Sequence, residues 1–251
     1  MVCRLDLGPR RMLVSGLMTL ACVLACASAL RPWVAQWAGR GTPPDRAART
    51  ALSINPGNHR FQVSLANLYQ YSLLLRDYPA ALTYYQSALR SNPLDSGSWL
   101  HLGKLYQKLD RHREADRALR LAVQLAPSDS TILWETTVAY LEAGQLPEAL
   151  RTLTRFIVVL SRDDTDRAKG YDLARRLTSP EEALDRVIPQ DVTNYAQYLK
   201  YLLDRNQTDE ALRVWGRLKE MHPAGYEPTD PALKRRLAEL LTARPGSTKS
   251  P

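Results

Sequence analysis

The sequence predicts an all-α protein, a solenoid of stacked helical hairpins preceded by one apolar helix close to the N-terminus. Two observations carry this prediction. Apolar residues recur at helical spacing with a period of 34 residues through most of the chain. One early stretch, Met12–Leu30, runs for 19 residues without a charge, and no later stretch approaches this length. The overall composition, 45% hydrophobic and 24% charged, is that of an ordinary globular protein and excludes wholesale disorder.

Residues 1–38 form a segment that we expect to direct the chain to a membrane. Within it, residues 12–30 are long enough to cross a hydrocarbon core of about 30 Å as a helix. Arg10 and Arg11 precede this stretch and two tryptophans follow it, a pattern typical of a cationic lead-in and an interfacial aromatic pair. We therefore expect an uncleaved single-pass anchor, with the rest of the chain in the periplasm or otherwise outside the cytoplasm.

Three other fates of this segment stay open. Ala27-Ser28-Ala29 is a small-x-small site at which a secretory signal would be cleaved, which would give a secreted protein. Cys26 follows Val-Leu-Ala in a stretch similar to a lipobox, and lipidation of Cys26 would make the chain a lipoprotein. The paired arginines also begin a weaker match to a twin-arginine signal. Since all three cysteines lie in the first 26 residues, the rest of the chain holds no disulfide or thiolate metal site.

A linker rich in Gly and Pro, residues 39–45, leads into the repeats. The clearest repeat is Ser96–Asp129, in which residues three or four apart form one face of a first helix and then of a second. Gly103 and Ala115 are small, so the two helices can approach closely, and Pro127 ends the second helix. The positions that define this repeat are Trp99, Leu102, Gly103, Tyr106, Ala115, Leu119, Ala122 and Pro127.

This spacing matches the tetratricopeptide pattern at every diagnostic position, and the chain resembles the tetratricopeptide repeat (TPR) family over residues 46–243. The resemblance implies a right-handed superhelix of α-helical pairs. It also implies a concave groove, lined by the first helix of each pair, that grips an extended peptide or a helix of a partner. Proteins of this family are usually non-catalytic adaptors.

The other repeats follow from the same period. The repeat 164–191 is degenerate because Pro189 cuts its second helix short. In the repeat 59–95 the first-helix core residues lie three positions early, so we expect that helix to carry a three-residue extension. The predicted segments are a lone second helix at 46–56, repeats 59–95, 96–129, 130–163 and 192–226, the degenerate unit 164–191, a capping helix 231–243 begun by Asp230, and a disordered tail 244–251.

Carrying the groove positions of the family onto this chain gives a set of candidate ligand-binding residues. Their amides and lysines, beside an exposed aromatic side chain, would suit an extended peptide of acidic or amidic character. An alternative stays open, in which Lys104 and Lys108 form one solvated face and Trp134 packs against its neighbour repeat. The candidates are Asn67, Gln70, Tyr71, Lys104, Gln107, Lys108, Trp134 and Lys200, with Ala196 and Asp204 beside Lys200 in the last repeat.

No pattern in the sequence supports catalysis. The four histidines form no pair at metal-ligand spacing on one helix, and no serine sits in a nucleophile elbow. We therefore expect no enzyme activity, no catalytic residue, no metal and no cofactor. The net charge of +8 favours anionic membrane surfaces or acidic partners, and because the basic residues are not interleaved with aromatic ones, no nucleic acid is expected.

Together these features predict a non-catalytic scaffold or adaptor at the bacterial cell envelope. Its expected partners are other proteins, and its expected membrane contact is through residues 12–30. Two alternatives stay open. One is a lipoprotein, lipidated at Cys26, that acts as a pilot or assembly factor for secretion, pilus or outer-membrane components. The other is an accessory protein of surface-polysaccharide synthesis or export, suggested by a loose resemblance of the C-terminal repeats.

Overall fold

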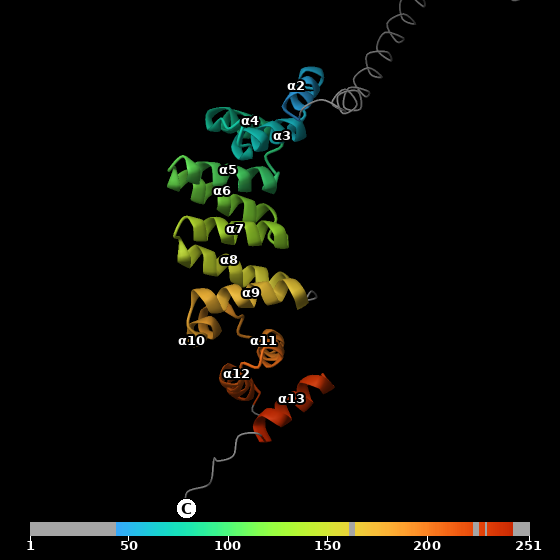
Figure 1. Ribbon diagram of the computed structural model, residues 1–251, viewed down its shortest axis with the longest axis vertical. Coiled ribbons are helices and arrows are strands. Elements are labelled where there is room, and N and C mark those ends of the chain that lie inside the picture. The colour runs from blue at the N-terminus through green and yellow to red at the C-terminus, as the bar shows by residue number, and fades with distance from the viewer. Residues whose placement is uncertain (1–43, 161–163, 223–225, 229, 243–251) are drawn as a thin grey trace, which may run out of the picture. The chain divides into compact units, whose positions relative to one another are not determined.

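A computed structural model describes residues 44–160, 164–222, 226–228 and 230–242 of the chain. These ranges fold into helices joined by short connections and contain no strand (Figure 1). In chain order the helices are α2 (Pro44–Ile54), α3 (His59–Tyr71), α4 (Tyr78–Ser91), α5 (Ser96–Lys108), α6 (His112–Leu125), α7 (Ser130–Glu142), α8 (Leu146–Val159), α9 (Asp164–Leu177), α10 (Pro180–Glu182), the π-helical turn η1 (Ala183–Val187), α11 (Val192–Asp204), α12 (Thr208–Met221) and α13 (Pro231–Thr242).

The predicted membrane segment 1–38 and the predicted tail 244–251 lie outside the described residues. Among the helices that the structure describes, none combines the length and the apolar character that crossing a bilayer requires. Helix α2 begins at Pro44, so it includes the last two residues of the predicted linker.

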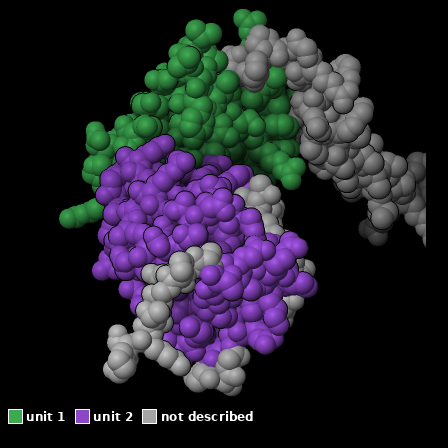
Figure 2. All heavy atoms as spheres, turned by 60° about the horizontal axis from the view of Figure 1, so that its bottom comes forward, with its two compact units in different colours: residues 1–125 green, residues 126–251 purple. Residues whose placement is uncertain are grey.

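The chain divides into two compact units, residues 1–125 and residues 126–251 (Figure 2). In the first unit α2 packs on α3, and the pairs α3/α4 and α5/α6 form successive helical hairpins. Leu65, Tyr85 and Leu105 are completely buried between them. Gly103 lies where α5 crosses α6 most closely, because a Cβ at this position would stand only 2.8 Å from two carbons of Leu119. A larger residue would therefore push the hairpin apart.

The turn between paired helices explains where the extra residues of the first hairpin lie. In three hairpins the second residue after the first helix has a positive φ, 55° at Asp110, 71° at Gly144 and 56° at Asn206. Glycine, Asn and Asp tolerate this left-handed conformation, whereas the corresponding residue of the first hairpin is Leu73, which does not. The short connection with a positive φ at its second residue is therefore not available to the hairpin α3/α4.

The expected three-residue extension of the first helix in repeat 59–95 was therefore wrong. Helix α3 has 13 residues, as α5 does, and the additional residues lie in the connection 72–77. Asp77 sets the end of this connection, because its carboxylate accepts a hydrogen bond from the backbone N–H of Ala80 at 3.0 Å and so caps α4. The connection 72–77 is called the leucine loop below, because Leu73, Leu74 and Leu75 form its centre.

The second unit contains the hairpins α7/α8 and α11/α12, with α9 between them. The partner of α9 is reduced to the single turn α10 and the π-helical turn η1. Ile188 then turns extended, with φ −78° and ψ 122°, as the residue before a proline must when it leaves a helix. Helix α13 packs on α11 through Leu233 and Leu237, and Asp230 caps it by accepting from the N–H of Ala232 at 2.9 Å.

Candidate functional site

Three of the candidate groove residues in the first unit belong to one hydrogen-bonded cluster. The hydroxyl of Tyr85 lies between the side-chain oxygens of Asn67 and Gln70, at 2.7 Å from the latter. Because a phenol has one proton, it donates to one of these amides, and the other amide must present its nitrogen to the phenol oxygen. Tyr71 lies beside His101, whose Nδ1 is 3.1 Å from the tyrosine hydroxyl.

The side chains of this cluster range from buried to exposed. Gln70 is buried, Asn67 is half-buried, and Tyr71 is exposed. His101 stacks on the ring of Tyr85 at 6.3 Å between centroids, and burial raises the pKa of the Tyr85 hydroxyl well above its ordinary value. The two amides therefore hold α3 against α4, and Tyr71 is the member of the cluster that offers a surface to a ligand.

The remaining candidates differ in exposure. In the first unit Lys104 and Gln107 are half-buried, while Lys108 at the end of α5 is exposed. In the second unit Trp134 is half-buried, and its ring packs on Phe156 of the same hairpin at 5.1 Å between centroids. This contact lies within the repeat 130–163 and is therefore not the packing against a neighbouring repeat that the sequence leaves open for Trp134.

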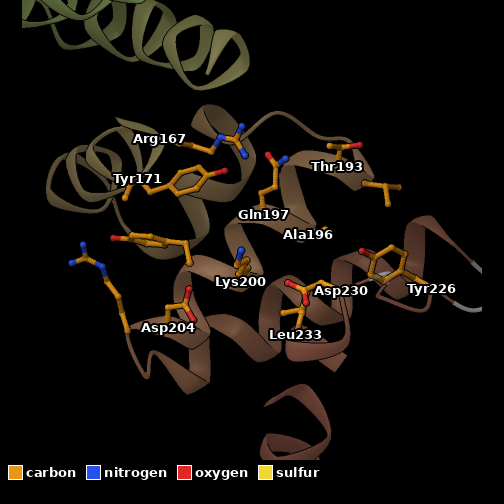
Figure 3. A pocket seen from close by; sticks show the side chains of 14 residues that line it. Arg167, Tyr171, Thr193, Ala196, Gln197, Lys200, Asp204, Tyr226, Asp230 and Leu233 are labelled. Atoms are coloured by element: carbon orange, nitrogen blue, oxygen red, sulfur yellow. The ribbon is translucent and has the colours of Figure 1, made fainter. Parts of the chain in front are cut away.

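The last candidate, Lys200, lies on a cavity of about 670 Å³ formed within the second unit by α9, α11, α13 and the segment before α13 (Figure 3). Ala196 and Asp204, the two other groove positions of the last repeat, also line it. A cavity of this size is in the range of ligand sites in proteins. The polar side chains on its wall are Arg167, Tyr171, Thr193, Gln197, Lys200, Tyr201, Asp204, Arg205, Tyr226 and Asp230.

Arg167 is the unusual member of this wall, because the side chain is only 2% exposed. Its Nη2 donates to the carbonyl oxygen of Leu160, while Nε and Nη1 have no hydrogen-bond partner among the described residues. The amide oxygen of Gln197, which also lines the cavity, is likewise buried without a hydrogen-bond partner among the described residues. A buried cation with two unused donors is costly unless something pairs with it.

The position of Arg167 in the repeat explains its burial. It is the fourth residue of α9, and the fourth residue of a first helix points into the core of its hairpin. The other first helices place uncharged residues there, namely Gln62, Trp99, Leu133 and Tyr195. The sequence analysis did not single out Arg167 or Gln197. A charged residue at the fourth position of a first helix is nevertheless a signal that the 34-residue period makes visible.

The carboxylates that line the cavity are already engaged. Asp204 pairs with Arg236, and Asp230 caps α13. On the rim, Arg205 pairs with Asp172 at 3.0 Å, and the same carboxylate accepts from the hydroxyl of Tyr201. None of these carboxylates pairs with Arg167 in the described part of the chain.

Stacked tyrosines hold the wall in place. The rings of Tyr171 and Tyr198 pack at 4.9 Å between centroids, and Tyr201 packs on both. Burial raises the pKa of Tyr198 and, together with the hydrogen bond to Asp172, that of Tyr201, so both phenols are neutral at physiological pH. In the ranges described here, no three His, Cys, Asp or Glu residues gather as they would around a metal ion.

Comparison with known families decides the identity of the repeats. The family model described as "Tetratricopeptide repeat" matches residues 73–130 and again residues 100–164. Residues 73–164 are tetratricopeptide repeats. These matches cover α4 to α8, the part of the TPR array in which the 34-residue period is most regular.

Among curated proteins, the TPR chain is similar to Superkiller protein 3 of Schizosaccharomyces pombe, with 28% identity over 88 residues. The matched stretch is 35% of this chain and 6% of that protein. The chain therefore spans only a small part of the length of this relative.

Solved structures with a similar backbone fold have low sequence identity to this chain. The crystal structure of MamA is 16% identical in sequence, with a TM-score of 0.40, over 72% of this chain and 90% of the other. YrrB, titled a TPR protein with an unusual peptide-binding site, is 17% identical, with a TM-score of 0.42, over 78% and 99%. PilF of Pseudomonas aeruginosa is 16% identical, with a TM-score of 0.45, over 85% and 97%.

Proposed function

We propose that this TPR protein is a non-catalytic scaffold held at a bacterial membrane by residues 12–30, and that it binds an extended segment of a partner protein. In this proposal a carboxylate of the partner enters the cavity of the second unit and pairs with Arg167. The observation that supports it is the buried guanidinium, two of whose donors have no hydrogen-bond partner among the residues that the structure describes.

The chemistry of the wall favours a carboxylate as the ligand group. A carboxylate can accept a hydrogen bond from a guanidinium nitrogen, and such charge-assisted hydrogen bonds are about twice as strong as neutral ones. The side chain of Arg167 lines the cavity, and Lys200 at the rim adds a second positive charge. Apolar wall residues such as Ala168 and Leu233 would pack against the methylene groups of an Asp or Glu side chain.

Replacing Arg167 by Met tests the site in two directions. Met keeps the length of the side chain and removes the charge, so the free protein should become more stable by about 1–4 kcal/mol, as when other buried ionic groups are replaced by apolar ones. The same variant should lose binding of acidic peptides. Urea unfolding of the full chain in detergent measures the first effect. Anisotropy titrations measure the second, with peptides selected from arrays in which Glu and Gln versions are paired.

Lys200→Gln is the matched control, because Lys200 lines the same cavity but is exposed. It should leave stability unchanged and weaken the Glu peptides only modestly, by about the 0–1 kcal/mol of an exposed ion pair. Loss of stability in Arg167→Met would contradict the proposal, since it would mean that Arg167 is held by structural contacts. Equal binding of Glu and Gln peptides to the unaltered protein would contradict it as well.

A second candidate is a pilot or assembly lipoprotein anchored through Cys26. The stretch Val-Leu-Ala-Cys that ends at Cys26 favours it. Replacing Cys26 by Ser distinguishes the two. If residues 12–30 are the anchor, membrane association is unchanged, whereas a lipoprotein would be released from the membrane.

A further inference from the structure

The leucine loop presents more apolar surface to solvent than any other connection described in the first unit. Leu73 is 84% exposed, Leu74 is 94% exposed and Leu75 is 38% exposed. Single exposed leucines are common on protein surfaces, but three in a row at the tip of a loop mark a contact site. We propose that Leu73 and Leu74 insert into the surface of the membrane to which this protein is anchored, which rests on the membrane anchor of the proposed function.

The reach of the chain supports a membrane as the partner. Arg49 of α2 contacts the ring of Tyr69, its guanidinium carbon 5.7 Å from the ring centroid, and the leucine loop begins three residues after Tyr69. The start of α2 at Pro44 is about 7.5 Å of helix away from Arg49. Thus the point from which the N-terminal segment departs lies within a few helix turns of the loop.

The tether between the proposed anchor and α2 is short. Residues 31–43 span at most about 45 Å when fully extended. A bilayer that held residues 12–30 would therefore keep the first unit close to its surface, and a tethered contact needs little affinity of its own to be occupied. The two leucines supply an apolar group that fits the acyl boundary of a bilayer.

The composition around the leucines also matches a membrane interface better than a protein partner. Arg76 follows the leucines and Tyr71 precedes them, and both are exposed. An arginine beside leucines places its charge at the headgroups while the leucines go deeper. A loop of six residues is also far smaller than the 20–30 residues per side of a stable interface between protein chains.

The test measures the depth of single labels on the full chain in vesicles of phosphatidylethanolamine and phosphatidylglycerol. Cys3, Cys22 and Cys26 are first replaced by Ser, and a nitroxide is then attached at one of three new cysteines. These are Leu74→Cys in the loop, Leu94→Cys as the control and Leu20→Cys in the proposed anchor. Leu94 is a fair control because it is 72% exposed and lies in the connection between α4 and α5.

Collision with oxygen, which concentrates in the bilayer, and with a water-soluble nickel chelate distinguishes the outcomes. We expect the label at position 74 to show a several-fold lower collision rate with the chelate than the label at position 94, and a higher rate with oxygen. Equal, water-like rates at 74 and 94, with position 20 in the bilayer, would overturn the inference and leave the anchor intact. Shielding of position 74 from both reagents would also overturn it, because protein would then cover the loop.

The label at position 20 separates failure of the anchor from failure of the inference. If position 20 behaves as a site in water, the membrane anchor is wrong, and the inference fails together with it. If position 20 lies in the bilayer, only the behaviour of position 74 decides. Every site labelled in the described part of the chain is exposed, so the labels leave the fold intact.

Discussion

The hydroxyl of Tyr85 shows how much a single polar atom can matter inside a helical repeat. It bonds the side chains of both Asn67 and Gln70, and Gln70 is only 5% exposed. A buried amide that loses its partner retains the cost of its desolvation, about 1–3 kcal/mol. These two amides therefore depend on one phenol.

Tyr85→Phe is expected to lower the free energy of unfolding by about 1–3 kcal/mol, because it removes the hydroxyl and leaves the amides unpaired. Urea unfolding measures the change. Tyr84→Phe serves as the control, since Tyr84 is the neighbouring tyrosine of the same helix and stacks on Tyr69 through its ring. Equal stability of the two variants would show that the amides find other partners.

The raised pKa of Tyr85 predicts the direction of the effect of alkaline pH. Burial favours the neutral phenol in the folded state, so the stabilisation is fully present below the ordinary tyrosine pKa of about 10. It is lost as the pH rises from there toward the raised pKa. In Tyr85→Phe this part of the alkaline loss of stability should be absent.

At the scale of helices, the close approach of α5 and α6 depends on Gly103. Gly103→Ala places a methyl group 2.8 Å from Leu119, which is completely buried and cannot move freely. We expect a loss of about 1–3 kcal/mol from overpacking, partly offset by the higher helix propensity of Ala. Thermal unfolding followed by circular dichroism measures it.

Gly216→Ala in α12 is the matched control. No atom lies within 4 Å of a Cβ at that position, so only the gain in helix propensity remains, and the variant should be more stable by up to about 1 kcal/mol. Destabilisation by both changes, or by neither, would mean that the approach of α5 to α6 does not set the effect.

The sequence predicts the regular hairpins well because their information is local. Core positions at fixed spacing define α5 to α8, α11 and α12, and Asp230 marks the start of α13. The position of the extra residues in the first hairpin was not predicted, because it depends on a backbone conformation that Leu73 cannot adopt. The π-helical turn before Pro189 is likewise set by backbone geometry that no residue pattern indicates.

The candidate site was predicted only at its rim. Lys200 occupies an outward position of α11, where counting along the family groove places it, and it does line the cavity. Arg167 holds an inward position, so a count of groove positions passes over it. Its role depends on which acceptors lie within hydrogen-bonding distance of the guanidinium in three dimensions, and the sequence alone does not contain this information.

Across the whole molecule, stability in a repeat protein is the sum of hairpins and their contacts with neighbours. The weakest hairpin in the second unit is α9 with α10 and η1, because its second helix is reduced to two short turns. The hairpin α5/α6, by contrast, has two full helices of 13 and 14 residues.

Hydrogen exchange is therefore expected to differ between these two hairpins. Amides of residues 180–188 should exchange about tenfold faster or more than those of α5 and α6, because local opening there breaks fewer buried contacts. Mass spectrometry of the full chain in detergent, after timed exposure to deuterated water, resolves the two regions. A uniform rate across both would indicate that η1 is as well supported as a complete helix.

The equal lengths of the hairpins also govern which insertions and deletions the chain can accept. In α5/α6, α7/α8 and α11/α12 the first helix has 13 residues and the second has 14. Each residue advances a helix by about 100°, so removing one inside a helix would rotate every later apolar side chain away from its neighbour. The leucine loop shows that added residues are accepted between the helices instead. Changes in chain length that persist in such an array therefore accumulate in its turns, where they alter the surface and leave the core in register.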